Sequence, residues 1–96
     1  MINQIEIELK LKALKPILSE KYFVEKIGYF GSYSRCDQTP DSDIDILIEL
    51  RKPLGWDFFD LQDLLEEELQ LKVDLVTTKA LRNELRRSIM NQTKYV

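Results

Sequence analysis

Histidine is absent from the sequence of 96 residues, and cysteine occurs once, at Cys36. Without histidine, the common zinc-binding sets and the catalytic triads built on histidine are excluded. A lone cysteine cannot form an internal disulfide. Any chemistry must therefore use carboxylates, hydroxyl groups, lysine, arginine and a metal ion that prefers oxygen ligands.

The sequence also lacks a long apolar run. Its uninterrupted apolar stretches span only a few residues, whereas a membrane-spanning helix needs about 18 to 20. Near the N-terminus, Glu6 and Glu8 occupy a region that is apolar in a signal peptide. We therefore expect a cytoplasmic protein with no membrane segment.

The sequence has fewer basic than acidic residues. It contains 14 Lys and Arg and 17 Asp and Glu, which gives a net charge of -3. Broad electrostatic binding to DNA, RNA or anionic lipid is disfavoured by this balance, so we expect no direct nucleic-acid binding. The length predicts a single domain over residues 1–96.

The first segment is ambiguous. Its apolar residues from Ile5 to Leu11 alternate with charged ones as in a strand, but the apolar positions from Ile5 to Leu18 also fit a helical stripe. The surrounding Glu, Lys, Leu and Ala favour a helix. A break is expected near Lys15, because Pro16 can begin a second helix.

The rest of the chain alternates between strands and helices. β-Branched and aromatic residues predict strands at 24–30, 43–50 and 72–76, the second being the core strand. Periodicity predicts a helical turn at 32–35 and helices at about 56–69 and 79–92, with a loop at 38–42 and a turn at 51–55. The expected fold is α+β (α/β), a small mixed sheet of three or more strands flanked by helices.

Two apolar groups have alternative interpretations. Trp56, Phe58 and Phe59 are interpreted as core anchors rather than a platform for stacking bases. The last predicted helix has apolar residues at 81, 85 and 89 and a basic face. We interpret it as packing on the sheet, with a partner-docking surface as the less favoured alternative.

Three aspartates form the first candidate site. Asp43 and Asp45 are two apart on a predicted strand, so both leave one face, about 6.6 Å apart; taken alone, this pattern is more typical of an exposed strand. Asp74 lies inside a short apolar strand, where Asp is disfavoured. It either pairs with Lys72 or Arg35, or it joins the other two carboxylates. Three carboxylates together need a cation, and Mg²⁺ suits them.

The dipeptide Gly31-Ser32 follows the first predicted strand. Glycine lets a ligand approach the backbone, serine adds a hydroxyl, and the following peptide N–H groups can bind an anion. Alone this is a weak signal, because most such pairs are turns. Together with the aspartates, it favours a site for a nucleoside triphosphate and its Mg²⁺.

The segment GSYSRCDQTPDSDID, from Gly31 to Asp45, resembles the signature of the polymerase-β-type nucleotidyltransferase superfamily. More narrowly, the chain resembles the MNT (minimal nucleotidyltransferase) domain proteins through YFGSYSR, SDIDILIEL and KVDLVTTKALR, as far as Tyr95. The resemblance implies the nucleotidyltransferase fold. It also implies two residue sets: Mg²⁺ held by Asp43, Asp45 and Asp74, and the β and γ phosphates of ATP held by Gly31 and Ser32.

Further implications concern the reaction and the partner. Arg35 matches a basic position that either neutralises phosphate charge or holds a carboxylate, and both roles stay open. Many MNT proteins are antitoxins of HEPN-domain ribonuclease toxins, and some transfer AMP from ATP to a tyrosine of the toxin. We therefore expect the acceptor hydroxyl to belong to a HEPN-domain partner, and the oligomeric state stays open.

The sequence departs from the family pattern at Cys36, where glycine is common. A positive φ at this position would strain a cysteine and could shift the loop that carries Arg35. The alternative function is therefore a catalytically inactive nucleotidyltransferase-like binding module that neutralises a partner by complex formation. A metal- or nucleotide-sensing domain would use the same residues.

Overall fold

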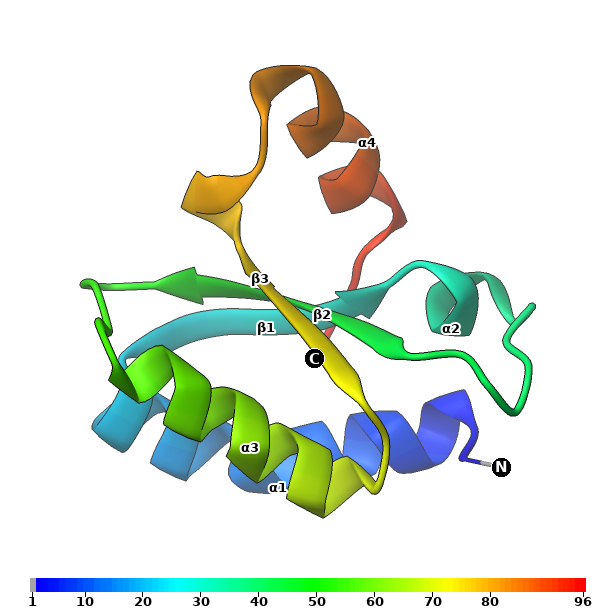
Figure 1. Cartoon of the computed structure of the whole chain (residues 1–96), viewed down its shortest axis with the longest axis horizontal. Coiled ribbons are helices and arrows are strands. Elements are labelled where there is room, and N and C mark those ends of the chain that lie inside the picture. Colours follow the sequence, from blue (N-terminus) through cyan, green and yellow to red (C-terminus); the bar gives the residue numbers. More distant parts are fainter. Residues whose placement is uncertain (1) are drawn as a thin grey trace.

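The computed structural model describes residues 2–96. Its elements are, in order, α1 (Gln4–Tyr22), β1 (Val24–Phe30), α2 (Ser32–Arg35), β2 (Ile44–Leu50), α3 (Asp57–Leu69), β3 (Val73–Thr77), η1 (Thr78–Ala80), α4 (Asn83–Gln92) and β4 (Lys94–Tyr95) (Figure 1). The sheet has the order β3-β2-β1-β4, with β2 and β3 parallel and the other pairs antiparallel. This mixed sheet with flanking helices confirms the predicted fold class.

The first segment is helical, and the helix α1 is longer than expected. Asn3 caps it by accepting a hydrogen bond from the Glu6 amide. The predicted break near Lys15 is wrong, because α1 runs through Pro16 without interruption. Proline removes one helical hydrogen bond, but wholly buried leucines before and after it (Leu11, Leu18) hold both halves against the core.

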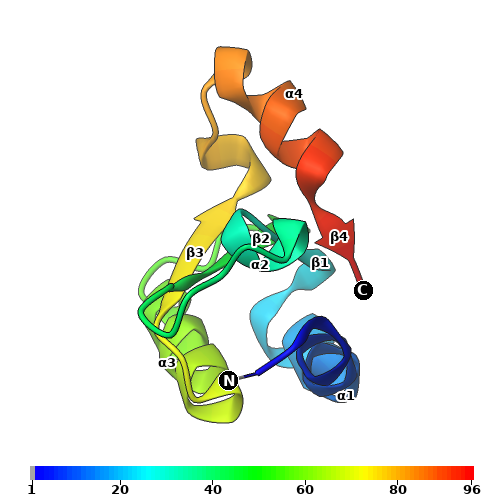
Figure 2. The ribbon, with the colours of Figure 1, turned by 90° about the vertical axis from the view of Figure 1, so that its right-hand side faces the viewer.

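The hydrophobic core lies between the sheet and the helices α1 and α3. Figure 2 shows both helices beneath one face of the sheet and α4 on the opposite side. The wholly buried side chains of this core come from α1, α3 and the central strands, and they include Ile7, Leu11, Leu18, Ile27, Ile44, Ile46, Ile48, Leu61 and Leu65. No helix within residues 2–96 is long and apolar enough to cross a membrane.

The aromatic residues near the start of α3 do not all enter the core. Phe58 packs partly against it, but Trp56 is 86% exposed and Phe59 is 56% exposed. The core-anchor interpretation is therefore wrong for Trp56 and Phe59. The buried stripe of α3 consists of leucines four residues apart (61, 65 and 69), and this stripe leaves the helix start outside the core.

The last helix also differs from its expected packing. Residues 78–80 form the separate turn η1, capped by the Thr77 side chain, so α4 begins only at Asn83. None of its residues is buried, and Leu85 is 50% exposed. The interpretation as a helix packed on the sheet is wrong. Figures 1 and 2 show α4 standing away from the sheet on the face opposite α1 and α3.

Candidate active site

Strand β2 fixes the direction of Asp45. Its neighbours Ile44 and Ile46 are wholly buried on the helix-covered side of the sheet. Side chains alternate along a strand, so Asp45 emerges on the opposite face, where α4 lies. The apolar packing of β2 thereby determines where its carboxylate stands.

Strand β3 brings Asp74 to the same place. Val73 and Leu75 are buried, so Asp74 alternates outward in the same way. The parallel pairing of β2 and β3 sets Asp45 directly opposite Asp74. The two carboxylates, separated by 29 positions in the sequence, are neighbours on one face of the sheet.

Asp43 lies just before β2, exposed and two residues from Asp45. Its charge acts on Asp45, although Asp74 has the larger effect. Within residues 2–96, no group of three or more carboxylate or thiol side chains is arranged to hold a metal ion as the side chains stand. The structure thus brings Asp45 and Asp74 together and leaves Asp43 at the edge of the pair.

The Asp45 carboxyl group has a perturbed acidity. Its pKa is raised from 3.8 to about 6, and the largest cause is burial. Repulsion from Asp74, a hydrogen bond with Asp74 and repulsion from Asp43 raise the pKa further, whereas the positive charge of Arg35 lowers it. A cation beside these carboxylates would relieve the repulsion. Their hard oxygen atoms suit Mg²⁺, so the donor set fits the expected metal.

Gly31 lies against the Asp45 carboxylate. It has φ 72° and ψ -147°, a backbone conformation that is essentially restricted to glycine. A Cβ atom on Gly31 would overlap the Asp45 side chain. Only glycine therefore allows the turn after β1 to approach this carboxylate so closely.

The turn α2 follows directly. Its residues Ser34 and Arg35 donate their amides to the Gly31 carbonyl, both at 3.1 Å, and the buried Ser34 hydroxyl donates to the same oxygen at 2.9 Å. The first amides of a helix have no acceptor within it, so the amide of the half-buried Ser32 can face a ligand, whereas Tyr33 is buried. Ser32 is half-buried at the start of this turn.

Arg35 extends from the end of α2. Its Nε donates to Asp37 at 3.1 Å, and the two side chains form an ion pair. Its Nη1 donates to the Gln92 side-chain oxygen at 3.2 Å. Arg35 therefore holds a carboxylate in this structure, which was one of the two roles that the sequence left open.

Sequence reasoning missed Gln92. Besides Arg35, its side-chain oxygen accepts a hydrogen bond from the Gly31 amide at 3.3 Å. Gln92 lies 61 residues beyond Gly31 at the end of an amphipathic helix, and no local motif marks it. Only the tertiary structure brings it to the site.

Cys36 ends α2 with φ 61° and ψ 30°, and its amide donates to the Ser32 carbonyl. The position does require a positive φ, as considered from the sequence, and cysteine adopts it. The exposed thiol lies in a turn with the hydrogen bonds of an ordinary left-handed helix end.

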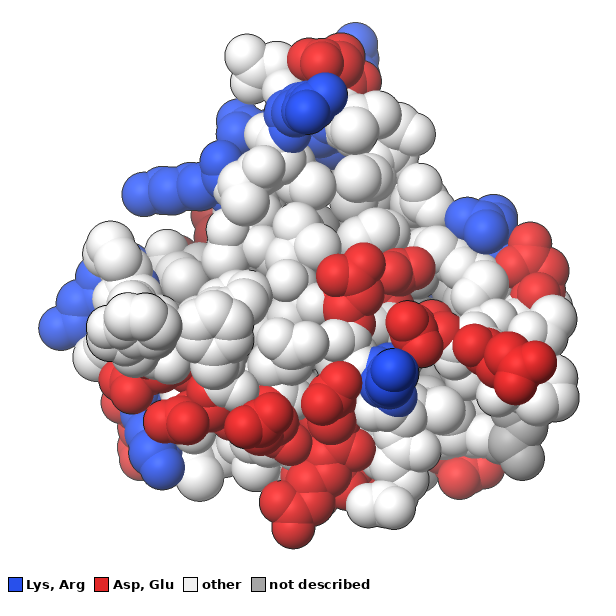
Figure 3. Space-filling view, viewed as in Figure 1, with Lys and Arg blue, Asp and Glu red and all other residues white. Residues whose placement is uncertain are grey.

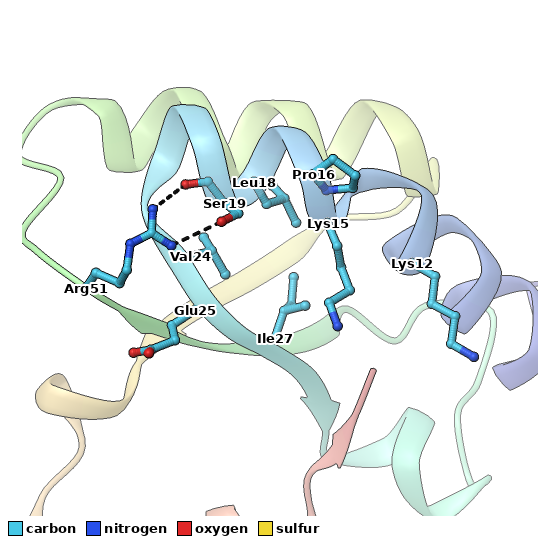
Figure 4. A pocket seen from close by; sticks show the side chains of 9 residues that line it. All are labelled: Lys12, Lys15, Pro16, Leu18, Ser19, Val24, Glu25, Ile27 and Arg51. Carbon is cyan, nitrogen blue, oxygen red and sulfur yellow. Dashed lines mark hydrogen bonds between the residues drawn. The ribbon is translucent and has the colours of Figure 1, made fainter.

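A cavity of about 540 Å³ lies elsewhere, between α1 and the start of β1 (Figure 4). Lys12, Lys15 and Arg51 line it, but Arg51 already donates to the hydroxyl and carbonyl oxygens of Ser19. The three candidate aspartates do not line this cavity.

Figure 3 shows acidic side chains across the lower part of the face in view, where α3 lies.

Comparisons with known proteins identify the family of this chain. Residues 11–96 match the nucleotidyltransferase domain model. The protein adenylyltransferase MntA of Thermococcus cleftensis is 38% identical over 97 aligned positions, which cover 100% of this chain and 98% of that protein.

Two solved structures are also similar. A toxin-antitoxin crystal structure with AMP-PNP is 29% identical, covering 90% of this chain and 70% of that one, with a TM-score of 0.73. The tri-AMPylated Shewanella oneidensis HEPN toxin in complex with its MNT antitoxin matches at 25% identity, covering 98% and 71%, with a TM-score of 0.68. The chain therefore belongs to the nucleotidyltransferase family, as an enzyme of its minimal (MNT) class.

Proposed function

We propose that this protein is a Mg²⁺-dependent nucleotidyltransferase that transfers AMP from ATP to a hydroxyl group of a partner protein. The observation that carries this proposal is the pairing of Asp45 with Asp74 beside the glycine turn at Gly31. Paired carboxylates next to a glycine turn that begins with an accessible serine suit a nucleoside triphosphate with its metal ion. The adenylyltransferase name of the Thermococcus cleftensis relative supports AMP as the transferred group.

The residues take the following roles in the proposal. Asp43, Asp45 and Asp74 hold Mg²⁺, which when bound offsets the negative charge of the phosphates. Gly31 and Ser32 hold the β and γ phosphates. Because Gly31 lies against the Asp45 carboxylate, the two sets of residues form one continuous site in this proposal.

The reaction is an in-line substitution. The acceptor oxygen forms a bond to the α phosphorus, and the bond from that phosphorus to the bridging oxygen breaks, so that pyrophosphate leaves. Asp74 can take the proton of the acceptor hydroxyl, since it is the more exposed member of the Asp45–Asp74 pair. Arg35, beside the turn, offsets charge on the leaving phosphates.

The partner in this proposal is a HEPN-domain protein, with the present chain as its antitoxin in the cytoplasm. Residues 1–96 act as one minimal domain, and the acceptor comes from the partner. The solved complex of an AMPylated HEPN toxin with its MNT antitoxin supports this pairing. The net charge of -3 makes a free nucleic acid a less suitable acceptor.

The alternative is a binding module without turnover, which the cysteine at position 36 favours. The geometry weakens that alternative, because Cys36 accommodates the left-handed turn and Arg35 remains next to the site. The two functions predict different products from the same mixture.

The test combines the pure protein with Mg²⁺, α-labelled ATP and a HEPN-domain protein from the same organism. We expect label on the partner, and loss of label when Mg²⁺ is chelated or when Asp43→Asn and Asp45→Asn are combined. Asp41→Asn, in the exposed loop before the site, is the matched control and should retain labelling. A stable complex that never becomes labelled would establish the binding module instead.

A further inference from the structure

We propose that Gln92 is a positioning residue of the nucleotide site, which acts by fixing Arg35 and the Gly31 amide. This inference rests on the proposed function, because it concerns how the same site receives the nucleotide. It assigns a role to the C-terminal end of α4, an element that carries none of the predicted site residues.

The contact is a fork centred on one atom. The Gln92 Oε1 atom accepts the Gly31 amide at 3.3 Å and Arg35 Nη1 at 3.2 Å. One donor is the backbone of the turn that approaches Asp45, and the other is the guanidinium of Arg35, whose positive charge acts to lower the pKa of Asp45. A single acceptor thus joins the backbone of the turn to the guanidinium beside it.

Two features of the fold place Gln92 there. Gln92 is the last residue of α4. The strand β4 that follows pairs with Gly28 and Tyr29 of β1, and this pairing holds the end of α4 next to the turn after β1. Gly28 allows this close approach, because a Cβ atom there would lie 2.7 Å from the Lys94 carbonyl oxygen and 2.7 Å from the Thr93 side chain.

The link is not a consequence of core packing. No residue of α4 is buried, so the contacts of Gln92 and the pairing of β4 are among the interactions that seat this helix. Arg35 is exposed and is otherwise held by Asp37 from its own turn. A long, flexible side chain loses much rotational freedom when it binds an anion. A second anchor on the guanidinium reduces that loss, so the nucleotide should bind more tightly with Gln92 than without it.

The acceptor oxygen can be tested with three variants. Gln92→Met keeps the length of the side chain and removes the acceptor, whereas Gln92→Glu keeps an acceptor for both donors. Asn91→Met, on the exposed neighbour, is the matched control. The measurement is the affinity for AMP-PNP with Mg²⁺ by calorimetry, with the melting temperature recorded for each protein.

We expect Gln92→Met to weaken binding about tenfold, the size typical of a lost hydrogen bond to a charged group. Gln92→Glu should remain within about threefold of wild type, because a carboxylate accepts the same two bonds and pairs with Arg35. Asn91→Met should bind as wild type. Equal affinity in Gln92→Met and wild type, or equal losses in Gln92→Met and Gln92→Glu, would overturn the inference.

A double variant tests whether Gln92 acts through Arg35. Arg35→Met and Gln92→Met are measured singly and together. The combined loss should be smaller than the product of the single losses, because removing Arg35 also removes one function of Gln92; a loss equal to the product would refute the coupling. If the wild-type protein fails to bind AMP-PNP, the proposed function itself is wrong, which separates that failure from the failure of this inference.

Discussion

Replacing Asp45 by asparagine should make the metal-free protein more stable. The folded state holds the Asp45 carboxyl at a pKa of about 6, above its usual value of 3.8, through burial and then through the nearby Asp74 and Asp43 carboxylates. At neutral pH, folding therefore places a carboxylate where its charge is disfavoured. Asparagine has nearly the same shape without the charge, so the variant should avoid this cost.

The size of the stability change follows from the raised pKa of Asp45. A pKa of about 6 against 3.8 corresponds to about 3 kcal/mol of lost stability at pH 7. Because Asp45 is partly exposed, screening by water reduces this figure, and we expect a gain of about 1 to 3 kcal/mol for Asp45→Asn. For a domain of this size, that gain raises the melting temperature by about 5 to 15 °C.

The sign also fixes the dependence on pH. The folded state binds this proton more tightly than the unfolded state, so the penalty from Asp45 is absent below pH 4, grows between pH 4 and 6 and is complete above about pH 6. The wild-type protein should therefore gain stability relative to Asp45→Asn when the pH falls from 7 to 5.

The assay is urea unfolding in EDTA at pH 7 and pH 5, with Asp41→Asn as the control for removing an exposed aspartate. The expected gain at pH 7 should shrink at pH 5 for Asp45→Asn and should be absent for Asp41→Asn. A variant that is equal to or less stable than wild type at pH 7 would refute the idea that burial and the neighbouring carboxylates disfavour the charge of Asp45 in the folded state.

Other substitutions test the backbone features of the fold. Gly31→Ala should strain the turn and displace Asp45. It should therefore lower the free energy of unfolding, measured with urea, by about 1 to 3 kcal/mol, and it should abolish AMP transfer in the labelling assay. Cys36→Gly should raise stability by about 0.5 to 1 kcal/mol, since glycine adopts φ 61° without strain; an unchanged unfolding midpoint would contradict this reason. Pro16→Ala should stabilise α1 by about 1 to 3 kcal/mol, measured by circular dichroism during thermal melting. Gly28→Ala should displace β4 and weaken AMP-PNP binding in calorimetry, in the same direction as Gln92→Met.

The sequence predicted the central strands well, because strands depend on local alternation. It predicted a cluster of three aspartates, of which the structure brings Asp45 and Asp74 together and leaves Asp43 at the edge. Buried residues at every second position identify the inner face of β2, and the same rule places Asp45 and Asp74 on the outer face. Only the adjacency of β2 and β3 had to be assumed, and the parallel register confirms it.

Other features could not be predicted from local patterns. The exposure of Trp56 and the lack of buried residues in α4 depend on how much surface the sheet offers, which no single segment encodes. Likewise, Gln92 reaches Gly31 only because β4 returns to pair with β1. An uninterrupted α1 at Pro16 also reflects tertiary packing, which overrides the local tendency of proline to end a helix.

The features that were predicted from the sequence are placed by the hydrophobic core, whereas those that were missed depend on exposed contacts. Asp45 stands between two wholly buried isoleucines, so its position is set by the core and does not require a favourable charge environment. The core can therefore hold two carboxylates together at neutral pH before any cation binds, and the cation then gains from repulsion that is already present. Gln92, in contrast, lies on α4, of which no residue is buried, and the Arg35 side chain that it contacts is exposed. The aspartate pair, which we propose as the metal-binding part of the site, should consequently be rigid and should lower the stability of the protein. The contact between Gln92 and Arg35 should instead be adjustable and sensitive to whatever binds α4.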